Sequence, residues 1–141
     1  MHAVLETDKG NITFRFHQRI APKTCENFAK LAKQGFYDGT KWHRVIDNFV
    51  IQGGCPQGDG KGDPGYNIDA ELSDRAHVRG TVAMARGRAL NSAGSQFYIC
   101  RSTLPHLDGQ YTIFGSVTAG LGVVDKIEPD DKLNRVSIIE D

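Results

Sequence analysis

The sequence has no excess of charge of either sign and no long apolar run. Seventeen lysines and arginines balance seventeen aspartates and glutamates, so no net field favours a nucleic acid or an anionic membrane as a partner. No stretch approaches the roughly 20 apolar residues of a membrane span, and residues 1–7 lack the three sections of a signal peptide. We therefore expect a cytoplasmic protein that binds neither nucleic acid nor membrane.

Cysteine is scarce, and histidine does not occur at metal-binding spacings. Cys25, Cys55 and Cys100 are an odd set without a CxxC pair, which argues for reduced thiols rather than disulfides or a zinc knuckle. The five histidines show no HExxH or i, i+4 spacing, so we expect no metal. A nucleophilic pair such as Cys55 with His43 stays open, because partners in space need not be neighbours in the chain.

Glycine is plentiful, with sixteen residues, six of them in the segment from Gly53 to Gly65. This composition favours an irregular loop that can lie close to a ligand. Residues 60–65 match GxGxxG, but the chain continues as loop instead of opening a helix, and no βαβ unit follows. We therefore expect neither a dinucleotide site nor any other cofactor.

The 141 residues fit a single domain over 1–141 that is built mainly of short strands. Apolar and β-branched runs bounded by turn residues predict strands at 4–7, 11–16, 42–46, 49–54, 81–85, 96–100, 111–117 and 135–139. One helix is predicted from Pro22 to a stop at Gly35, and a shorter one around 121–127. The last strand could pair with the first ones. Without a βαβ rhythm, these elements predict a mainly β fold, a closed eight-stranded antiparallel barrel capped by two α-helices.

Two polar side chains stand out on the apolar strands at 42–46 and 49–54. Arg44 stands in the run Trp42-His43-Arg44-Val45-Ile46, and Gln52 follows three apolar residues. A guanidinium beside so much apolar surface costs desolvation free energy unless it meets a partner or faces a wet cleft. Arg44 is therefore the first candidate functional residue, with a structural salt bridge as the alternative.

Two later blocks, residues 91–99 and 107–115, set small polar residues before Gln96 and an Asp-Gly turn before Tyr111. Together with 42–46 and 49–54, in the right order and over nearly the whole chain, they resemble the signature segments of the cyclophilin family of peptidyl-prolyl cis-trans isomerases. The resemblance implies an eight-stranded barrel closed by two helices, with a peptide groove on one outer face. It also implies cofactor-independent isomerisation of Xaa-Pro bonds in polypeptides, which assists protein folding.

The resemblance implies a role for individual residues. Arg44 and Gln52 are the implied catalytic residues, and Gln96 is a further polar group of the groove; for both glutamines a role in tying down local backbone also stays open. The implied walls of the proline pocket are Phe49, Val50, Tyr98 and Leu107. The implied lining of the surrounding groove is Ile46, Ala85, Arg86, Gly87, His106 and Tyr111. Of two neighbouring aromatic residues, Phe97 is assigned to the core and Tyr98 to the groove.

Four residues depart from the common family pattern. Val50 replaces methionine, Tyr98 replaces phenylalanine, His106 replaces tryptophan and Tyr111 replaces histidine. The hydroxyl that Tyr98 adds must find water or a partner. Family members without the tryptophan tend to bind cyclosporin less well, so we expect cyclosporin to bind with reduced affinity.

Two functions fit these residues, and both have proline-containing polypeptides as partners. The first is a monomeric prolyl isomerase. The second is a module of the same fold that binds proline-containing segments in a protein complex, with incidental activity. A proline clamp would not need an arginine, so Arg44 together with Gln52 favours the enzyme.

Overall fold

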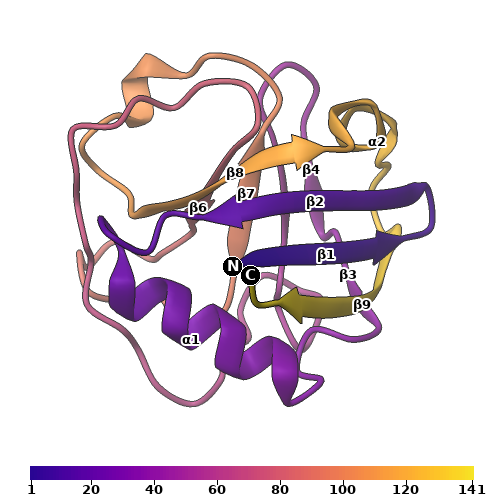
Figure 1. Cartoon of the computed structure of the whole chain (residues 1–141), viewed down its shortest axis with the longest axis horizontal. Helices are drawn as coiled ribbons and strands as arrows, with labels where there is room; N and C mark the ends of the chain where they lie inside the picture. Colours follow the sequence, from indigo (N-terminus) through magenta and orange to yellow (C-terminus); the bar gives the residue numbers. More distant parts are fainter.

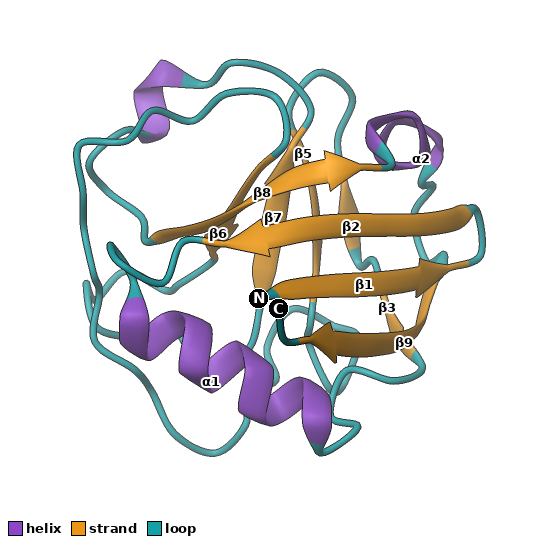
Figure 2. Cartoon of the chain, in the orientation of Figure 1, coloured by secondary structure: helices purple, strands orange, loops and turns teal.

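The computed structural model describes residues 1–141 as one antiparallel sheet with two α-helices (Figures 1 and 2). The strands are β1 (His2–Thr7), β2 (Gly10–Phe16), β3 (Thr40–Lys41), β4 (Arg44–Val45), β5 (Val50–Gly53), β6 (Thr81–Met84), β7 (Phe97–Cys100), β8 (Ile113–Ala119) and β9 (Lys132–Ile139). The helices are α1 (Pro22–Lys33) and α2 (Leu121–Lys126), and the 3-10 turn η1 (Pro105–Leu107) lies between β7 and β8. The prediction of a mainly β fold with two helices is confirmed.

The sheet is curled but open, so the prediction of a closed eight-stranded barrel is wrong. Its nine strands run in the order β3-β9-β1-β2-β8-β6-β7-β5-β4, and the edges β3 and β4 do not pair with each other. Each edge strand has only two residues, which is too short a ladder to close the curl. Only an isolated bridge between Lys41 and Cys55 spans the opening. The strand expected over 42–46 is correspondingly reduced to Arg44–Val45.

The two ends of the chain meet inside the sheet. β1 pairs with β2 through a tight hairpin, in which Gly10 takes a φ of 124°, a conformation that glycine adopts without strain. On its other side β1 pairs with β9, so that His2 lies opposite Ile139 and the two termini are neighbours (Figure 1). The predicted pairing of the last strand with the first is confirmed.

Seven aromatic residues pack together with aliphatic ones inside the curl. Phe14 from β2 and Phe28 from α1 are fully buried and meet edge to face, with ring centroids 5.5 Å apart. Phe97 from β7 packs edge-on against the same Phe28 ring at 5.2 Å. α1 packs against β9 and α2 against β2 (Figure 1). Neither helix is long and apolar enough to cross a membrane.

A distant carboxylate caps the N-terminus of α1. The helix begins after Ala21, which offers no side-chain cap, so its first N–H groups need partners from elsewhere. Glu71, in the long loop between β5 and β6, accepts hydrogen bonds from the N–H and the hydroxyl of Thr24, both at 2.7 Å, and from the N–H of Lys23 at 3.3 Å. This contact fastens the loop to the helix and places negative charge at the positive end of the helix dipole.

We expect Glu71→Ala to lower the free energy of unfolding by about 1–2 kcal/mol, because it leaves the first N–H groups of α1 without their acceptor. Urea denaturation of the two proteins measures this difference. Asp69→Ala is the matched control, since Asp69 is an exposed carboxylate in the same loop without a hydrogen bond of its side chain. Equal midpoints for the two variants would show that the cap contributes nothing.

Candidate functional site

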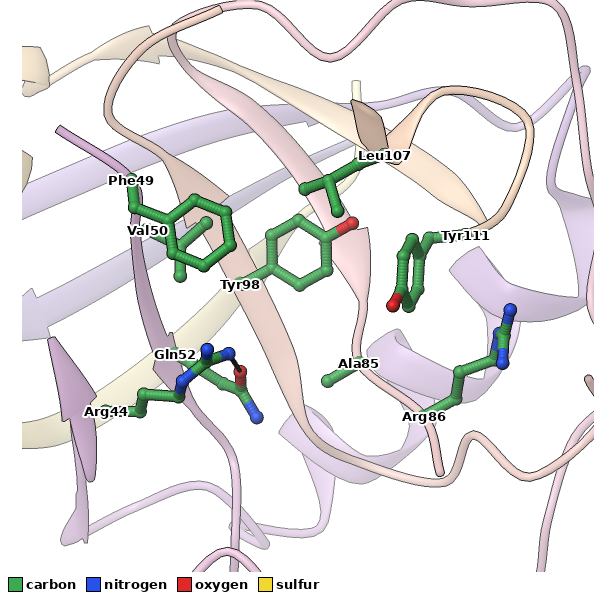
Figure 3. A pocket seen from close by; sticks show the side chains of 9 residues that line it. All are labelled: Arg44, Phe49, Val50, Gln52, Ala85, Arg86, Tyr98, Leu107 and Tyr111. Atoms are coloured by element: carbon green, nitrogen blue, oxygen red, sulfur yellow. Dashed lines mark hydrogen bonds between the residues drawn. The ribbon is translucent and has the colours of Figure 1, made fainter. Parts of the chain in front are cut away.

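A hollow of about 140 Å³ lies on the outer face of the sheet, over β5, β6 and β7. Nine side chains line it (Figure 3): Arg44, Phe49, Val50, Gln52, Ala85, Arg86, Tyr98, Leu107 and Tyr111. Tyr98 lies at its centre, with Phe49 and Val50 on one side and Leu107 and Tyr111 on the other. All nine belong to the residues that the sequence resemblance proposed for the groove.

Strand register brings these side chains together. β5 pairs with β7 so that Gln52 lies opposite Tyr98, and β4 pairs with β5 so that Arg44 lies opposite Gln52. Since side chains alternate between the two faces of a strand, Tyr98 points to the groove whereas its neighbour Phe97 points into the larger core. Val50 and Tyr98 are nearly fully buried and belong to a separate, smaller apolar cluster under the groove.

Arg44 is held without any acidic partner. Its Nη1 donates to Oε1 of Gln52 at 3.3 Å (Figure 3), and its guanidinium carbon lies 5.4 Å from the centre of the Phe49 ring. None of the salt bridges in the structure includes Arg44. The side chain is exposed, so it is less desolvated than its apolar flanks suggest, and the alternative of a structural salt bridge does not apply. One face of the guanidinium and most of its donors stay free for a ligand.

Gln96 both supports Gln52 and ties down backbone. Its Oε1 accepts a hydrogen bond from Nε2 of Gln52 at 3.2 Å, while its own Nε2 donates to the carbonyl oxygens of Gly60 and Gly62 at 2.9 and 3.0 Å. Gln96 therefore ties down local backbone, one of the two roles that the sequence left open, while its role as a polar group of the groove stays a prediction. Through these bonds, the glycine-rich loop, Gln52 and Arg44 form one hydrogen-bonded chain.

The other wall of the hollow is held by a second arginine. The guanidinium carbon of Arg86 lies 4.8 Å from the centre of the Tyr111 ring, within the range of a cation–π contact. Its nitrogens donate to the carbonyl oxygen of Gln110 at 2.9 and 3.1 Å, and also to those of Gly87 and Arg88. Arg86 thus fixes Tyr111 with most of its donors already used, in contrast to Arg44.

Four expected groove residues lie outside the hollow. Gly87 and Gln96 line an adjoining polar hollow of about 240 Å³, which shares Gln52, Ala85 and Arg86 with the first one. Ile46 is 39% exposed in the turn before β5, outside both. His106 is an exposed rim residue whose ring stacks on Phe49, with centroids 5.9 Å apart.

Sequence reasoning missed the partner of the Tyr98 hydroxyl. His77, fully buried before β6, lies 2.8 Å from that hydroxyl through Nε2 and 3.0 Å from Asp108 through Nδ1. Burial lowers the pKa of His77, although Asp108 acts in the opposite direction. Burial also raises the pKa of Tyr98 well above the ordinary value, so this hydroxyl stays protonated. No local pattern marks His77, because its partners are 21 and 31 residues away in the sequence.

No thiol is arranged as a nucleophile. Sγ of Cys55 contacts Asp59 and the N–H of Gly62, not His43, so the Cys–His pair that the sequence left open does not form. Burial raises the pKa of both Cys25 and Cys100 to about 12, which keeps these thiols protonated and unreactive. The three cysteines are free and buried.

A buried arginine supports the turn that carries Phe49. Arg101 follows β7 and donates to the carbonyl oxygens of Val124 and Ile127 at the end of α2, at 2.7–3.2 Å. Its backbone N–H donates to the carbonyl of Phe49 at 2.7 Å, and its Nη1 reaches Asp47 at 3.3 Å. Arg101 therefore joins α2, β7 and the turn before β5 in one contact.

Comparisons with known proteins show which proteins the chain is similar to. A family model described as cyclophilin type peptidyl-prolyl cis-trans isomerase/CLD matches residues 2–139. A peptidyl-prolyl cis-trans isomerase of Synechococcus elongatus is 48% identical, and the match covers 99% of this chain and 97% of that protein. Another, of Helicobacter pylori, is 46% identical, and the match covers 96% of this chain and 85% of that protein. Among solved structures, a Cryptosporidium parvum cyclophilin type isomerase, crystallised in the presence of the dipeptide Ala-Pro, superposes with a TM-score of 0.93 at 32% identity, and both chains are covered completely.

We expect Arg101→Leu to lower the free energy of unfolding by about 3 kcal/mol, because it leaves buried carbonyl groups without their donor. Arg79→Leu is the matched control: Arg79 forms a bidentate pair with Asp125 of α2, but both side chains are more than 40% exposed, and exposed pairs contribute little. Chemical denaturation of both variants checks the difference. A loss for Arg79→Leu as large as that for Arg101→Leu would contradict it.

Proposed function

The chain belongs to the cyclophilin-type peptidyl-prolyl cis-trans isomerase family, and we propose that the hollow around Arg44 and Tyr98 is where it binds and isomerises Xaa-Pro bonds. One observation carries this assignment of the site. A guanidinium without an acidic partner stands beside an apolar hollow, held from behind by Gln52. The proposed substrates are flexible or unfolded polypeptides, in line with the Ala-Pro dipeptide named for the Cryptosporidium parvum relative.

The reaction breaks no covalent bond but has to overcome amide resonance. Rotation about an Xaa-Pro bond faces a barrier of about 18–20 kcal/mol and takes tens to hundreds of seconds. Acceleration to the millisecond range requires roughly 10⁵-fold, or about 7 kcal/mol. One charge-assisted hydrogen bond supplies about 1.5–3 kcal/mol net. The site must therefore also bind the twisted amide better than either planar form.

Arg44 is the proposed electrophilic catalyst, and it acts as a hydrogen-bond donor. As the amide twists, the prolyl nitrogen becomes pyramidal and its lone pair becomes available as an acceptor. The guanidinium donates a hydrogen bond to this lone pair and so holds it out of resonance with the carbonyl. Because Oε1 of Gln52 occupies only Nη1, the remaining N–H groups are free for this contact.

The apolar walls hold the proline ring while the rest of the bond rotates. Phe49, Val50, Tyr98 and Leu107 offer the ring a hollow whose shape is set by strands β5 and β7. Gln52 and backbone groups of the adjoining loop are the proposed contacts for the carbonyl before the proline. Rotation then takes place about a clamped ring, which is how binding free energy is converted into catalysis.

The alternative is a module that binds proline-containing segments with incidental turnover. It explains the apolar walls but leaves the free donors of Arg44 without a use. The cytoplasmic location, the monomeric state and the role in assisting protein folding that the sequence suggested stay predictions.

We expect Arg44→Ala to lower kcat/KM for a proline-containing peptide about 10- to 100-fold, the value of one charge-assisted hydrogen bond in the transition state. Arg44→Lys should recover little of this, because an ammonium lacks the planar fork of donors. A protease-coupled isomerisation assay measures both.

Arg15→Ala is the control for that experiment, since Arg15 is an exposed arginine on β2, away from the hollow. Equal rates for wild type and Arg44→Ala would remove Arg44 from the mechanism. No activity in either protein, with peptide binding retained, would favour the binding module.

We expect His106→Trp to tighten cyclosporin binding about tenfold, because a larger ring on the exposed rim beside Phe49 adds apolar contact area. Isothermal titration of wild type and variant measures the change. His2→Trp, on β1 across the sheet, is the control for a nonspecific effect of tryptophan. Unchanged affinity in His106→Trp would show that the rim position does not set drug sensitivity.

A further inference from the structure

A hydrogen-bonded network centred on the buried His77 lies behind the central wall of the hollow. Oδ1 of Asp108 accepts from the backbone N–H of His77 at 2.7 Å and lies 3.0 Å from Nδ1 of the same residue. Nε2 of His77 lies 2.8 Å from the hydroxyl of Tyr98. The imidazole has no exposed surface, so both of its nitrogens are satisfied within the protein.

The chemistry of the partners fixes the direction of these bonds. A carboxylate only accepts, so Nδ1 of His77 carries the proton and donates it to Asp108. In the neutral imidazole Nε2 then accepts, and the Tyr98 hydroxyl donates to it. Lowered pKa values of Asp108 and His77 and a raised pKa of Tyr98 agree with an ionised carboxylate, a neutral imidazole and a neutral phenol.

The rings are fixed in orientation as well as in hydrogen bonding. The rings of His77 and Tyr98 are nearly parallel, at 13°, with centroids 5.9 Å apart. Tyr111 stands perpendicular to Tyr98 at the same centroid distance. Asp108 directly follows Leu107, another wall residue. The network therefore joins the strand β7 wall to the segment that carries the opposite wall.

We propose that His77, oriented by Asp108, is a positioning residue for the isomerase reaction: it holds the Tyr98 hydroxyl away from the hollow and so keeps the proline-binding wall apolar and in place. Without Nε2 as acceptor, the buried hydroxyl must turn toward the hollow or draw in water. Either change brings a polar group to the surface that contacts the ring of the substrate. The inference rests on the proposed function, because it assumes that the hollow receives proline.

The network also gives this role a dependence on pH. Asp108 faces Nδ1, the Tyr98 hydroxyl faces Nε2, the Tyr111 ring lies perpendicular at 6.4 Å, and His106 adds a repulsive positive charge when protonated. A proton on Nε2 would turn His77 into a donor and leave the Tyr98 hydroxyl without its acceptor. Because the pKa of His77 is lowered by burial, the neutral form prevails above the ordinary value near 6.5 and is lost as pH falls through the lowered one.

A double-mutant cycle on His77 and Tyr98 tests the proposal. We expect His77→Phe to raise KM for an Xaa-Pro peptide about tenfold with kcat little changed, since it orphans a buried hydroxyl in the binding wall. In the Tyr98→Phe background, where no hydroxyl needs a partner, the same substitution should change KM by less than about twofold, because replacing both partners by apolar groups is nearly neutral. A His77→Phe effect of equal size in both backgrounds, or no effect in either, would overturn the proposal.

A second measurement needs no substitution of the buried histidine. With a peptide that has no titratable side chain, KM of the wild type should stay constant down to the ordinary histidine pKa of about 6.5 and rise only below it, as pH falls through the lowered pKa of His77. Asp108→Asn keeps the acceptor oxygen but removes the negative charge that favours protonated His77, so the rise should begin at lower pH. Tyr98→Phe should show no such rise. An equal rise of KM in the wild type and in Tyr98→Phe would overturn the proposal.

Peptide affinity, measured by fluorescence anisotropy alongside KM, separates this inference from the function on which it rests. A wild type that binds the peptide without isomerising it would contradict the proposed catalysis. The double-mutant cycle on His77 and Tyr98 would then be evaluated from Kd values instead of KM. A wild type that neither binds nor isomerises the peptide would overturn both.

Discussion

The antiparallel pairing of β5 with β7 is the constraint on which the groove depends. It places Gln52 opposite Tyr98, and with this single register the polar and the apolar halves of the site become neighbours. A shift by one residue would exchange the two faces of β7 and bring Phe97 outward in place of Tyr98. Because Phe97 is packed against Phe28 in the larger core, the core itself fixes the register of the site.

The two arginines of the groove have different roles, one structural and one with free hydrogen-bond donors. Arg86 has its donors taken up by backbone carbonyl groups and acts as a rigid support for Tyr111. Arg44 is held at one nitrogen by a neutral amide and keeps the others available. A carboxylate in place of Gln52 would neutralise Arg44 and weaken its attraction for a lone pair, so an amide is the partner that fixes the position of the guanidinium without quenching it.

Local patterns in the sequence predicted most of the individual strands and both helices, because short-range signals determine these elements. The opening hairpin with Gly10, the helix from Pro22 and the strand that carries Gln52 were found because alternation and turn residues are short-range signals. Of the nine lining residues, Arg44 and Gln52 stood out as polar residues on apolar strands, and the other seven came from the family resemblance. The prediction of a closed barrel was wrong, because closure depends on the lengths of the edge strands β3 and β4. No local sequence pattern indicates these lengths. Contacts such as those of Glu71, His77 and Arg101 were missed because they join residues 20 to 50 positions apart.

The pairing of β1 with β9 has a consequence for how this chain itself folds. β1, the first strand of the sheet in chain order, is hydrogen-bonded on one side to β9, the last one. Until β9 has left the ribosome, one edge of β1 and part of the aromatic core remain uncovered. Such long sequence separation slows folding and prolongs the exposure of unpaired strand edges. The sheet of this domain therefore cannot be completed until β9 has been synthesised and has paired with β1.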